Sequence, residues 1–408
     1  MAEFSLNSTP VKKSLLETLR RTGPMTFERY MTFCLYHPEF GYYTHGRERT
    51  GVAGDYFTSS DLHPVFARLV ARQAAEMWNI MGRPQPFTWV EMGAGRGFFV
   101  CDFLSWSSAA LPDFAAALEY VVIEPDSRQR ERIRDRLSAV GVEKKVRRLA
   151  DLEELQPITG CFFSNELVDA FPVHVVTRAG GRLKEIYVIA EGDDLREKYG
   201  PLSGTAVAAY VARYAPQLEE GHRMEANLHA PAWMRAVAGK LTRGFVLTID
   251  YGDRANRLYT PERPRGTLLA YRGHTSTEDF FMAPGETDLT AHVNFSALID
   301  AGKAAGLEFA GFTTQERFLL ALGEPNQFAD VYDPGQTEPE RLQARLRLKR
   351  LISPDTMGSI FKALLQQRGV PGAELSGWKF ERRPSKARSQ VGVFARNHPG
   401  ARRLPSRR

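Results

Sequence analysis

The chain has 408 residues, of which 43% are hydrophobic and 25% are charged, a composition typical of a globular protein and not of a disordered or fibrous one. Its length exceeds that of one typical compact domain, which predicts two domains or one domain with large additions. The net charge of +6 is modest, and much of it lies in local runs such as 341–350 and the carboxyl-terminal tail, which argues against a nucleic-acid-binding groove.

The cysteines indicate a reducing compartment. Cys34, Cys101 and Cys161 are few and scattered, which argues against both a disulfide framework and a zinc site. The amino terminus lacks a basic region followed by an apolar run, and no apolar segment reaches the roughly 20 residues that a membrane helix needs. We therefore expect a cytoplasmic protein without membrane insertion.

The first part of the chain predicts a helical cap. Helical spacing of apolar residues predicts two short helices within residues 11–35. The loop that follows contains residues 54–60, whose hydroxyls and carboxylate suit a loop that folds over a ligand. The alternative is an ordinary turn that caps the next helix, predicted over residues 64–81.

A glycine-rich turn follows a predicted buried strand that ends at Met92. Gly93, Gly95 and Gly97 remove Cβ atoms where a ligand must approach the backbone, and the following helix offers free amide groups. Such a turn is where small-molecule cofactors bind in doubly wound sheets. Because Phe98 stands where the dinucleotide fingerprint requires its third glycine, an NAD site is disfavoured. A turn that only packs a helix on a sheet is the alternative.

Strand and helix patterns then alternate, as an α/β sheet requires. Glu124 follows the second predicted strand directly, and a carboxylate at this position can accept hydrogen bonds from both ribose hydroxyls of an adenosine group. Asp151 and Leu152 follow a third short strand and are candidates for holding the adenine amino group. Helix capping is the alternative role for Glu124 and for Asp151.

A polar pair, Asn165 and Glu166, follows the fourth predicted strand, residues 160–163. This places both side chains beside any cofactor held by the first strand. Beyond them the pattern predicts a β-hairpin at 174–190, helices at 204–216 and 231–241, and a fifth strand at 244–249. A long irregular segment at 253–293 comes next. It is followed by a helix at 295–305, a strand at 307–313, helices at 338–352 and 355–369, and a final strand at 390–395.

Six motifs occur in order along the chain: GDYFTS at 54–59, VEMGAGRG at 90–97, NELVDAFPVH at 165–174, DYG at 250–252, GTLLAYRGH at 266–274 and DLTAHV at 288–293. The glycine motif is similar to the first motif of the class I S-adenosylmethionine-dependent methyltransferases, and the six together resemble the MidA family. That family includes bacterial proteins and a mitochondrial complex I assembly factor that methylates an arginine of a complex I subunit. The departures, Ala94 for Pro, Tyr56-Phe57 for Phe-Ile and Asn294 for Asp, are mild.

The resemblance implies an α/β protein with the Rossmann-like sheet of a class I methyltransferase, an amino-terminal helical cap and an additional, mostly helical insert or carboxyl-terminal subdomain. It also implies S-adenosylmethionine as the cofactor. We expect the cofactor to be held by Asp55, Thr58, Ser59, Glu91, Gly93, Gly95, Gly97, Glu124, Asp151, Leu152 and Asn165.

The same resemblance suggests a division of the chain into four segments. The cap and a cofactor-covering loop would occupy residues 1–85, and the methyltransferase core would occupy 86–313 with its long loop 253–293. A helical subdomain over 314–396 would return to the sheet as its reversed final strand. A basic, disordered tail over 397–408 would complete the chain.

Acidic residues after the fourth strand are the candidates for catalysis. Glu166 and Asp169 are similar in placement to the acidic loop of protein arginine methyltransferases. An arginine side chain stays charged, so paired carboxylates would hold one of its nitrogens towards the methyl group. The alternative is a helix whose first turn is stabilised by acidic residues. His274 and His292 are weaker candidates for substrate contacts, and neither shows a metal-ligand spacing, so no metal is expected.

We therefore expect a methyltransferase that acts on an arginine side chain of a protein, such as a subunit of a respiratory NADH dehydrogenase. Methylation of a small molecule is a second hypothesis, and a non-catalytic assembly chaperone that binds S-adenosylmethionine is a third. Methylation of nucleic acid is disfavoured, because the end of the fourth strand lacks the Pro-Pro-aromatic signature of that class. The sequence leaves the oligomeric state open.

Overall fold

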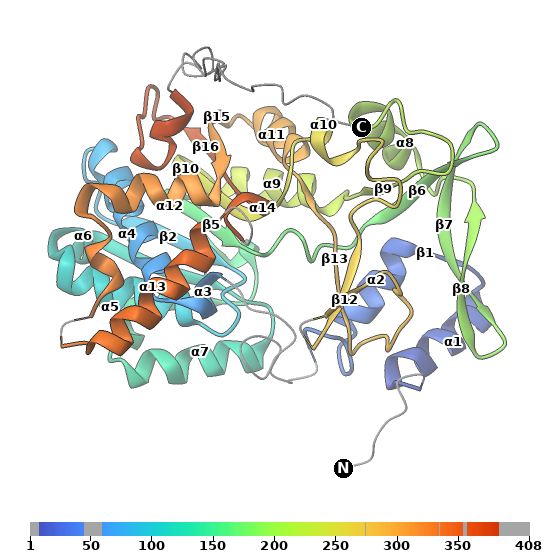
Figure 1. Ribbon diagram of the computed structural model, residues 1–408, viewed down its shortest axis with the longest axis horizontal. Helices are drawn as coiled ribbons and strands as arrows, with labels where there is room; N and C mark the ends of the chain where they lie inside the picture. Colours follow the sequence, from blue (N-terminus) through green and yellow to red (C-terminus); the bar gives the residue numbers. More distant parts are fainter. Residues whose placement is uncertain (1–7, 45–58, 274, 334, 354–356, 383–408) are drawn as a thin grey trace, which may run out of the picture.

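The structure is a computed structural model that describes residues 8–44, 59–273, 275–333, 335–353 and 357–382. Figure 1 shows two parts side by side: a large sheet covered by helices, and a smaller sheet against which the first two helices pack.

The large sheet has the strand order β15-β16-β10-β5-β2-β3-β4 in the described part of the chain. Its strands are β2 (Phe87–Met92), β3 (Leu118–Ile123), β4 (Val146–Leu149), β5 (Ile158–Asn165), β10 (Leu241–Asp253), β15 (Glu308–Thr314) and β16 (Phe361–Arg368), and short β14 (Val293–Asn294) pairs with the end of β10. Neighbouring strands from β10 to β4 are parallel, whereas β16 runs antiparallel to both of its neighbours. This α/β architecture was expected from the alternating strand and helix pattern.

Helices cover both faces of the large sheet because its central strands carry apolar side chains on both sides. Trp89 and Phe163 point into one core, whereas Val90 and Phe162 point into the other, as the two-residue period of a strand requires. The first core contains residues of α4 (Val65–Ile80), α5 (Phe98–Ala110), α6 (Pro112–Ala117), α7 (Ser127–Ala139), α12 (Gln315–Gly323) and α13 (Glu338–Ile352). The second contains residues of α9 (His229–Lys240) and α11 (Phe295–Ala304).

The smaller sheet is built largely from the segment that follows β5. Its strands are β1 (Met25–Thr26), β6 (His174–Ala179), β7 (Arg182–Glu191), β8 (Asp194–Gly200) and β9 (Arg223–Ala226). Helices α1 (Pro10–Thr22) and α2 (Phe27–Tyr36) share an apolar core with this sheet, and α8 (Thr205–Tyr214) contributes to another. The expected amino-terminal helices are therefore present, but they rest on an antiparallel sheet.

The segment 253–293, expected to be irregular, holds a third sheet formed by β11 (Leu269–Arg272), β12 (Thr275–Thr277) and β13 (Asp288–Thr290), and the short helix α10 (Ala255–Leu258). Further short elements are α3 (Ser59–Leu62), α14 (Met357–Ile360), η1 (Glu143–Lys145), η2 (Leu152–Glu154), η3 (Glu324–Asn326), η4 (Ala329–Val331) and η5 (Ser376–Arg382). None of the helices in the described residues is both long and apolar enough to span a membrane.

The helix predicted over 355–369 is wrong, because most of this segment is the reversed strand β16. Its residues favour helices in isolation, but all except the last are buried between β10 and β15. The reversed strand was instead expected at 390–395, which lies outside the described residues. The division of the chain at residues 85, 313 and 396 remains a prediction. Helix α4 lies in the predicted cap segment 1–85, but it packs against α5 of the predicted methyltransferase core.

Candidate functional site

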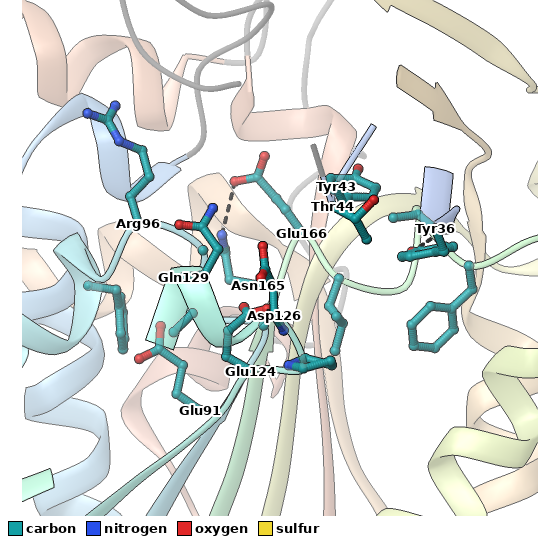
Figure 2. Close-up of a pocket in the computed structure, with 18 of the residues that line it drawn as sticks. Tyr36, Tyr43, Thr44, Glu91, Arg96, Glu124, Asp126, Gln129, Asn165 and Glu166 are labelled. Atoms are coloured by element: carbon teal, nitrogen blue, oxygen red, sulfur yellow. Dashed lines mark hydrogen bonds between the residues drawn. The ribbon is translucent and has the colours of Figure 1, made fainter. Parts of the chain in front are cut away.

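A cavity of about 1430 Å³ lies at the carboxyl edge of β2, β3 and β5. Its walls come from the glycine turn, the residues after β3 and β5, and helices α2, α7 and α9. Figure 2 shows carboxylates near the ends of the strands, with Tyr36, Tyr43 and Thr44 on one side of the cavity. Segments from both parts of the molecule therefore meet at one site.

The glycine turn connects β2 to α5 at the base of the cavity. Gly93 and Gly95 have φ values of 73° and 52°, in the left-handed region that side chains disfavour. A Cβ atom on Gly93 would lie 2.8 Å from Cδ1 of Leu167, so the turn packs closely against the chain after β5. A Cβ atom on Gly95 would meet no atom within 4 Å, so the backbone there faces open space where a ligand can approach it.

Two carboxyls line the cavity at the strand ends. Glu91 is only 4% exposed and accepts a hydrogen bond of 2.7 Å from the hydroxyl of Tyr120, and burial raises the pKa of its carboxyl to about 8. Burial also raises the pKa of Glu124 to about 7, although the amides of Asp126 and Gly95 donate to this carboxyl and oppose the rise. Both groups are therefore partly protonated near neutral pH.

Asn165 and Glu166 lie at the end of β5 and both face the cavity. Oε1 of Glu166 accepts hydrogen bonds from the Ser59 amide at 2.8 Å and from Nδ2 of Asn165 at 3.0 Å. Glu166 has a φ of 53°, a conformation that costs a non-glycine residue roughly 1 kcal/mol. Oδ1 of Asn165 is buried and has no hydrogen-bond partner among the described residues. The unpaired acceptor fits a polar ligand in the cavity.

Asp250 fixes the turn after Glu166. Its Oδ2 atom accepts hydrogen bonds from the amides of Leu167, Val168 and Asp169, at 3.2, 2.9 and 3.4 Å. The side chain of Asp250 is buried, and burial and the nearby Asp169 raise its pKa. The motif at 250–252 is therefore part of the support of the site.

Asp169 does not share the position of Glu166. Its side chain is only 6% exposed and is absent from the cavity wall. It faces the hydroxyl of Tyr251, and burial raises the pKa of its carboxyl to about 6. The expected pair of carboxylates around one guanidinium is not what the structure shows, because the turn after Glu166 directs Asp169 inward.

Other expected residues lie away from the cavity. Asp151 is exposed and caps η2 by accepting a hydrogen bond from the amide of Glu153 at 2.8 Å, and Leu152 belongs to a hydrophobic core. The expected cofactor roles of Asp151 and Leu152 thus have no geometric support.

His292 lies beside Tyr251 and Arg263, and burial lowers the pKa of its imidazole to about 4, which keeps it neutral.

Asp55, Thr58 and His274 lie outside the described residues. Ser59 is buried, and its amide contacts Glu166 as stated above. In the parts of the chain that the structure describes, no group of three or more His, Cys, Asp or Glu side chains is arranged to hold a metal ion.

Four aromatic side chains on the cavity wall, Tyr36, Tyr43, Phe171 and Trp233, were not expected, and we call this part of the wall the aromatic arm. The rings of Tyr36 and Tyr43 stack with their centroids 5.5 Å apart, and the rings of Phe171 and Trp233 meet edge to face at 6.1 Å. Only Phe171 lies in a motif singled out from the sequence. Tyr36 and Trp233 lie on helices, where an aromatic residue is usually part of a core, so the sequence carried no signal for them.

Residues 69–313 match the model of the Methyltransf_28 family, whose members are described as S-adenosyl-L-methionine-dependent methyltransferases. The chain belongs to this methyltransferase family. Its cofactor is S-adenosylmethionine, as the resemblance implied, and the residues at the strand ends fit that molecule. Gly95 leaves the backbone open, and Glu91, Glu124 and Asn165 offer oxygen acceptors to the polar ends of a cofactor.

Relatives of this methyltransferase span nearly its full length. Protein arginine methyltransferase NDUFAF7 of Mus musculus is 27% identical over 392 residues, covering 89% of this chain and 86% of that protein. The Homo sapiens protein of the same name is 26% identical over 413 residues, covering 95% and 89%. A COG1565 superfamily member from Burkholderia thailandensis, bound to S-adenosyl-homocysteine in its crystal structure, is 31% identical with a TM-score of 0.81 and covers 90% of this chain and 94% of that chain.

Proposed function

We propose that this methyltransferase transfers the methyl group of S-adenosylmethionine to an arginine side chain of a protein. The observation that carries the proposal is the position of Glu166, a carboxylate fixed by two donors on the wall of the same cavity as the glycine turn. Relatives that match at least 89% of this chain and are named as protein arginine methyltransferases support this choice of acceptor.

The cofactor would occupy the arm of the cavity at the strand ends. The Gly95 backbone and Glu91 would face its aminoacyl end, and the carboxylate of Glu124 would accept hydrogen bonds from the ribose hydroxyls. Oδ1 of Asn165, which has no partner among the described residues, would accept a hydrogen bond from a donor of the cofactor or acceptor. When bound, the cofactor supplies a methyl group that is already a strong electrophile.

Glu166 would then hold and orient the nucleophile. A guanidinium keeps its charge at neutral pH, so a carboxylate attracts it and directs one nitrogen towards the methyl carbon. That nitrogen would form a bond to the methyl carbon, the sulfur would keep the electron pair of the broken carbon–sulfur bond and leave as a neutral thioether, and the nitrogen would release its proton to water. Alignment of the three atoms is the main requirement of such a transfer.

The aromatic arm of the cavity would admit the acceptor. Its walls are mainly apolar or aromatic and suit the methylene groups of an arginine side chain, over which aromatic rings also attract the guanidinium. Trp233 is one of the aromatic residues on this part of the cavity wall.

Trp233 provides a test of this assignment. Trp233→Ala is expected to raise the KM for the protein acceptor by about tenfold, because a large aromatic contact is lost. The Kd of S-adenosylhomocysteine, measured by calorimetry, should change by less than about twofold, since that ligand occupies the other arm. A variant that loses cofactor affinity and keeps its acceptor KM would reverse the assignment of the two arms.

The raised pKa values of Glu91 and Glu124 predict a pH dependence of cofactor binding. Ionised carboxylates attract an ammonium group and bind two ribose hydroxyls more strongly than protonated carboxyls do, so binding releases protons below their pKa values of about 8 and about 7. Affinity for S-adenosylhomocysteine is therefore expected to increase as the pH rises from about 6 to about 8. Calorimetry in buffers of different ionisation enthalpy measures the released protons. Binding without proton release at about pH 6 would contradict these roles.

The proposed acceptor class is tested by labelling. Tritiated S-adenosylmethionine and the purified enzyme would be added to an extract of source cells that lack the gene, separated into protein and small molecules. We expect the label in protein. We propose a subunit of a respiratory NADH dehydrogenase as the acceptor. Label confined to small molecules would support the alternative acceptor class. Binding of S-adenosylhomocysteine without any labelling would support a chaperone.

A further inference from the structure

Glu166 is connected to the carboxyl-terminal helices through two buried residues, Ser59 and Gln315. The amide of Ser59 donates to Oε1 of Glu166 at 2.8 Å, and the hydroxyl of the same serine donates to Oε1 of Gln315 at 3.2 Å. Nε2 of Gln315 donates to the carbonyl of Leu351, also at 3.2 Å. Ser59 and Gln315 have no exposed side-chain surface, so water does not compete for these bonds.

The carbonyl of Leu351 determines the direction of this connection. A carbonyl only accepts hydrogen bonds, so the amide nitrogen of Gln315 must face it and the amide oxygen must face Ser59. The serine hydroxyl must then donate to Gln315. Each group has one compatible role, which makes the position of Ser59 depend on Gln315.

The connection joins three segments that are far apart in the sequence. Gln315 is the first residue of α12, Leu351 lies in the last turn of α13, and Ser59 begins α3. Ser59 also belongs to the segment 54–60 that we expected to fold over the cofactor, of which residues 54–58 lie outside the described part of the chain. The carboxyl-terminal helices thus contact the support of the cavity wall, although none of their residues lines the cavity.

We propose that Gln315 is a positioning residue, which holds Ser59 so that the serine amide fixes the carboxylate of Glu166. The inference rests on the proposed function, in which Glu166 orients the acceptor nitrogen. Gln315 does not line the cavity, so it contacts neither the cofactor nor the acceptor. Its effect is on the alignment of Glu166, and displacement of a positioned group by about 1 Å is enough to slow a reaction by about a hundredfold.

Substitution of Gln315 by Leu tests the proposal against a matched control. Gln73 is also fully buried, and it holds the carboxyl-terminal segment by accepting a hydrogen bond from the Gly377 amide at 2.9 Å. The initial rate of tritium transfer into the deletion-strain extract is expected to fall by at least about tenfold in Gln315→Leu and less than about twofold in Gln73→Leu. Both should bind S-adenosylhomocysteine normally. Equal rates in the two variants would overturn the proposal.

A second variant, Gln315→Glu, keeps the test valid if the leucine variant does not fold. A protonated glutamic acid donates to the Leu351 carbonyl and accepts from Ser59, but an ionised one has no proton to donate. The rate of Gln315→Glu relative to the unmodified enzyme is therefore expected to approach one at low pH and to fall as pH rises. A relative rate that does not change with pH would contradict the positioning role.

Combination with Glu166→Gln separates the two claims. If Gln315 acts through Glu166, Gln315→Leu causes no further loss of rate in the Glu166→Gln background. Independent, multiplicative losses would overturn the positioning role and leave the proposed function intact. A Glu166→Gln variant with full activity would instead contradict the proposed function itself.

Discussion

Glu166→Gln is expected to lower the rate of methyl transfer by about 10²- to 10³-fold, the range seen when one group that stabilises charge in a transition state is removed. The amide oxygen of the new glutamine can still accept hydrogen bonds from the Ser59 amide and from Nδ2 of Asn165. The shape of the turn should therefore persist while the charge that attracts a guanidinium is lost. The measurement is the initial rate of tritium transfer at saturating S-adenosylmethionine, alongside the Kd of S-adenosylhomocysteine.

Asp169→Asn provides the comparison for this prediction. Both carboxylates were candidates from the sequence, but the structure places Asp169 against Tyr251 and off the cavity wall. Asp169→Asn is therefore expected to keep most of the activity of the unmodified enzyme. A loss of activity as large as that of Glu166→Gln, with an unchanged melting temperature, would support the catalytic carboxylate pair that the sequence suggested.

Glu124→Ala is expected to weaken the binding of S-adenosylhomocysteine by about a hundredfold. Two hydrogen bonds from ribose hydroxyls to a charged carboxylate would be lost, and each tenfold change in affinity corresponds to about 1.4 kcal/mol. Calorimetry with S-adenosylmethionine, S-adenosylhomocysteine and NAD measures the effect. The unmodified enzyme should bind only the first two.

Glu119→Ala is the control for this experiment. Glu119 lies at the other end of β3, where it contacts Arg147 at 2.8 Å and Thr88 at 3.1 Å on the sheet surface. Loss of this glutamate should leave the affinity for S-adenosylhomocysteine within about twofold of the original. Equal weakening by both substitutions would indicate damage to the strand, and unchanged affinity in Glu124→Ala would remove the proposed ribose contact.

Much of the sheet and its cofactor edge could be predicted because local signals there agree with the fold. Apolar runs identified β2, β3 and β5, and the glycine turn between β2 and α5 marked the edge at which a ligand binds. Glu91, Glu124, Asn165 and Glu166 all line the cavity, as their positions at the ends of strands implied. The order of strands and helices was enough, because parallel strands end at the same edge.

Long-range contacts explain what could not be predicted. β16 reads as a helix because its lysine and glutamines favour helices, and only its neighbours β10 and β15 impose an extended form. The inward direction of Asp169 depends on the turn held by Asp250, which lies 81 residues further along the chain. Gln315 gave no signal at all, since a glutamine at the start of a helix is normally exposed. The cytoplasmic location remains a prediction.

Transfer to arginine can be tested by amino-acid analysis of the labelled acceptor. After transfer from tritiated S-adenosylmethionine, the labelled protein band would be hydrolysed in acid and its amino acids separated beside methylated standards. We expect the label to elute as methylated arginine, and enzyme carrying Glu166→Gln to yield little of it. Label that elutes as methyl-lysine, or as any amino acid other than a methylated arginine, would show that arginine is not the acceptor.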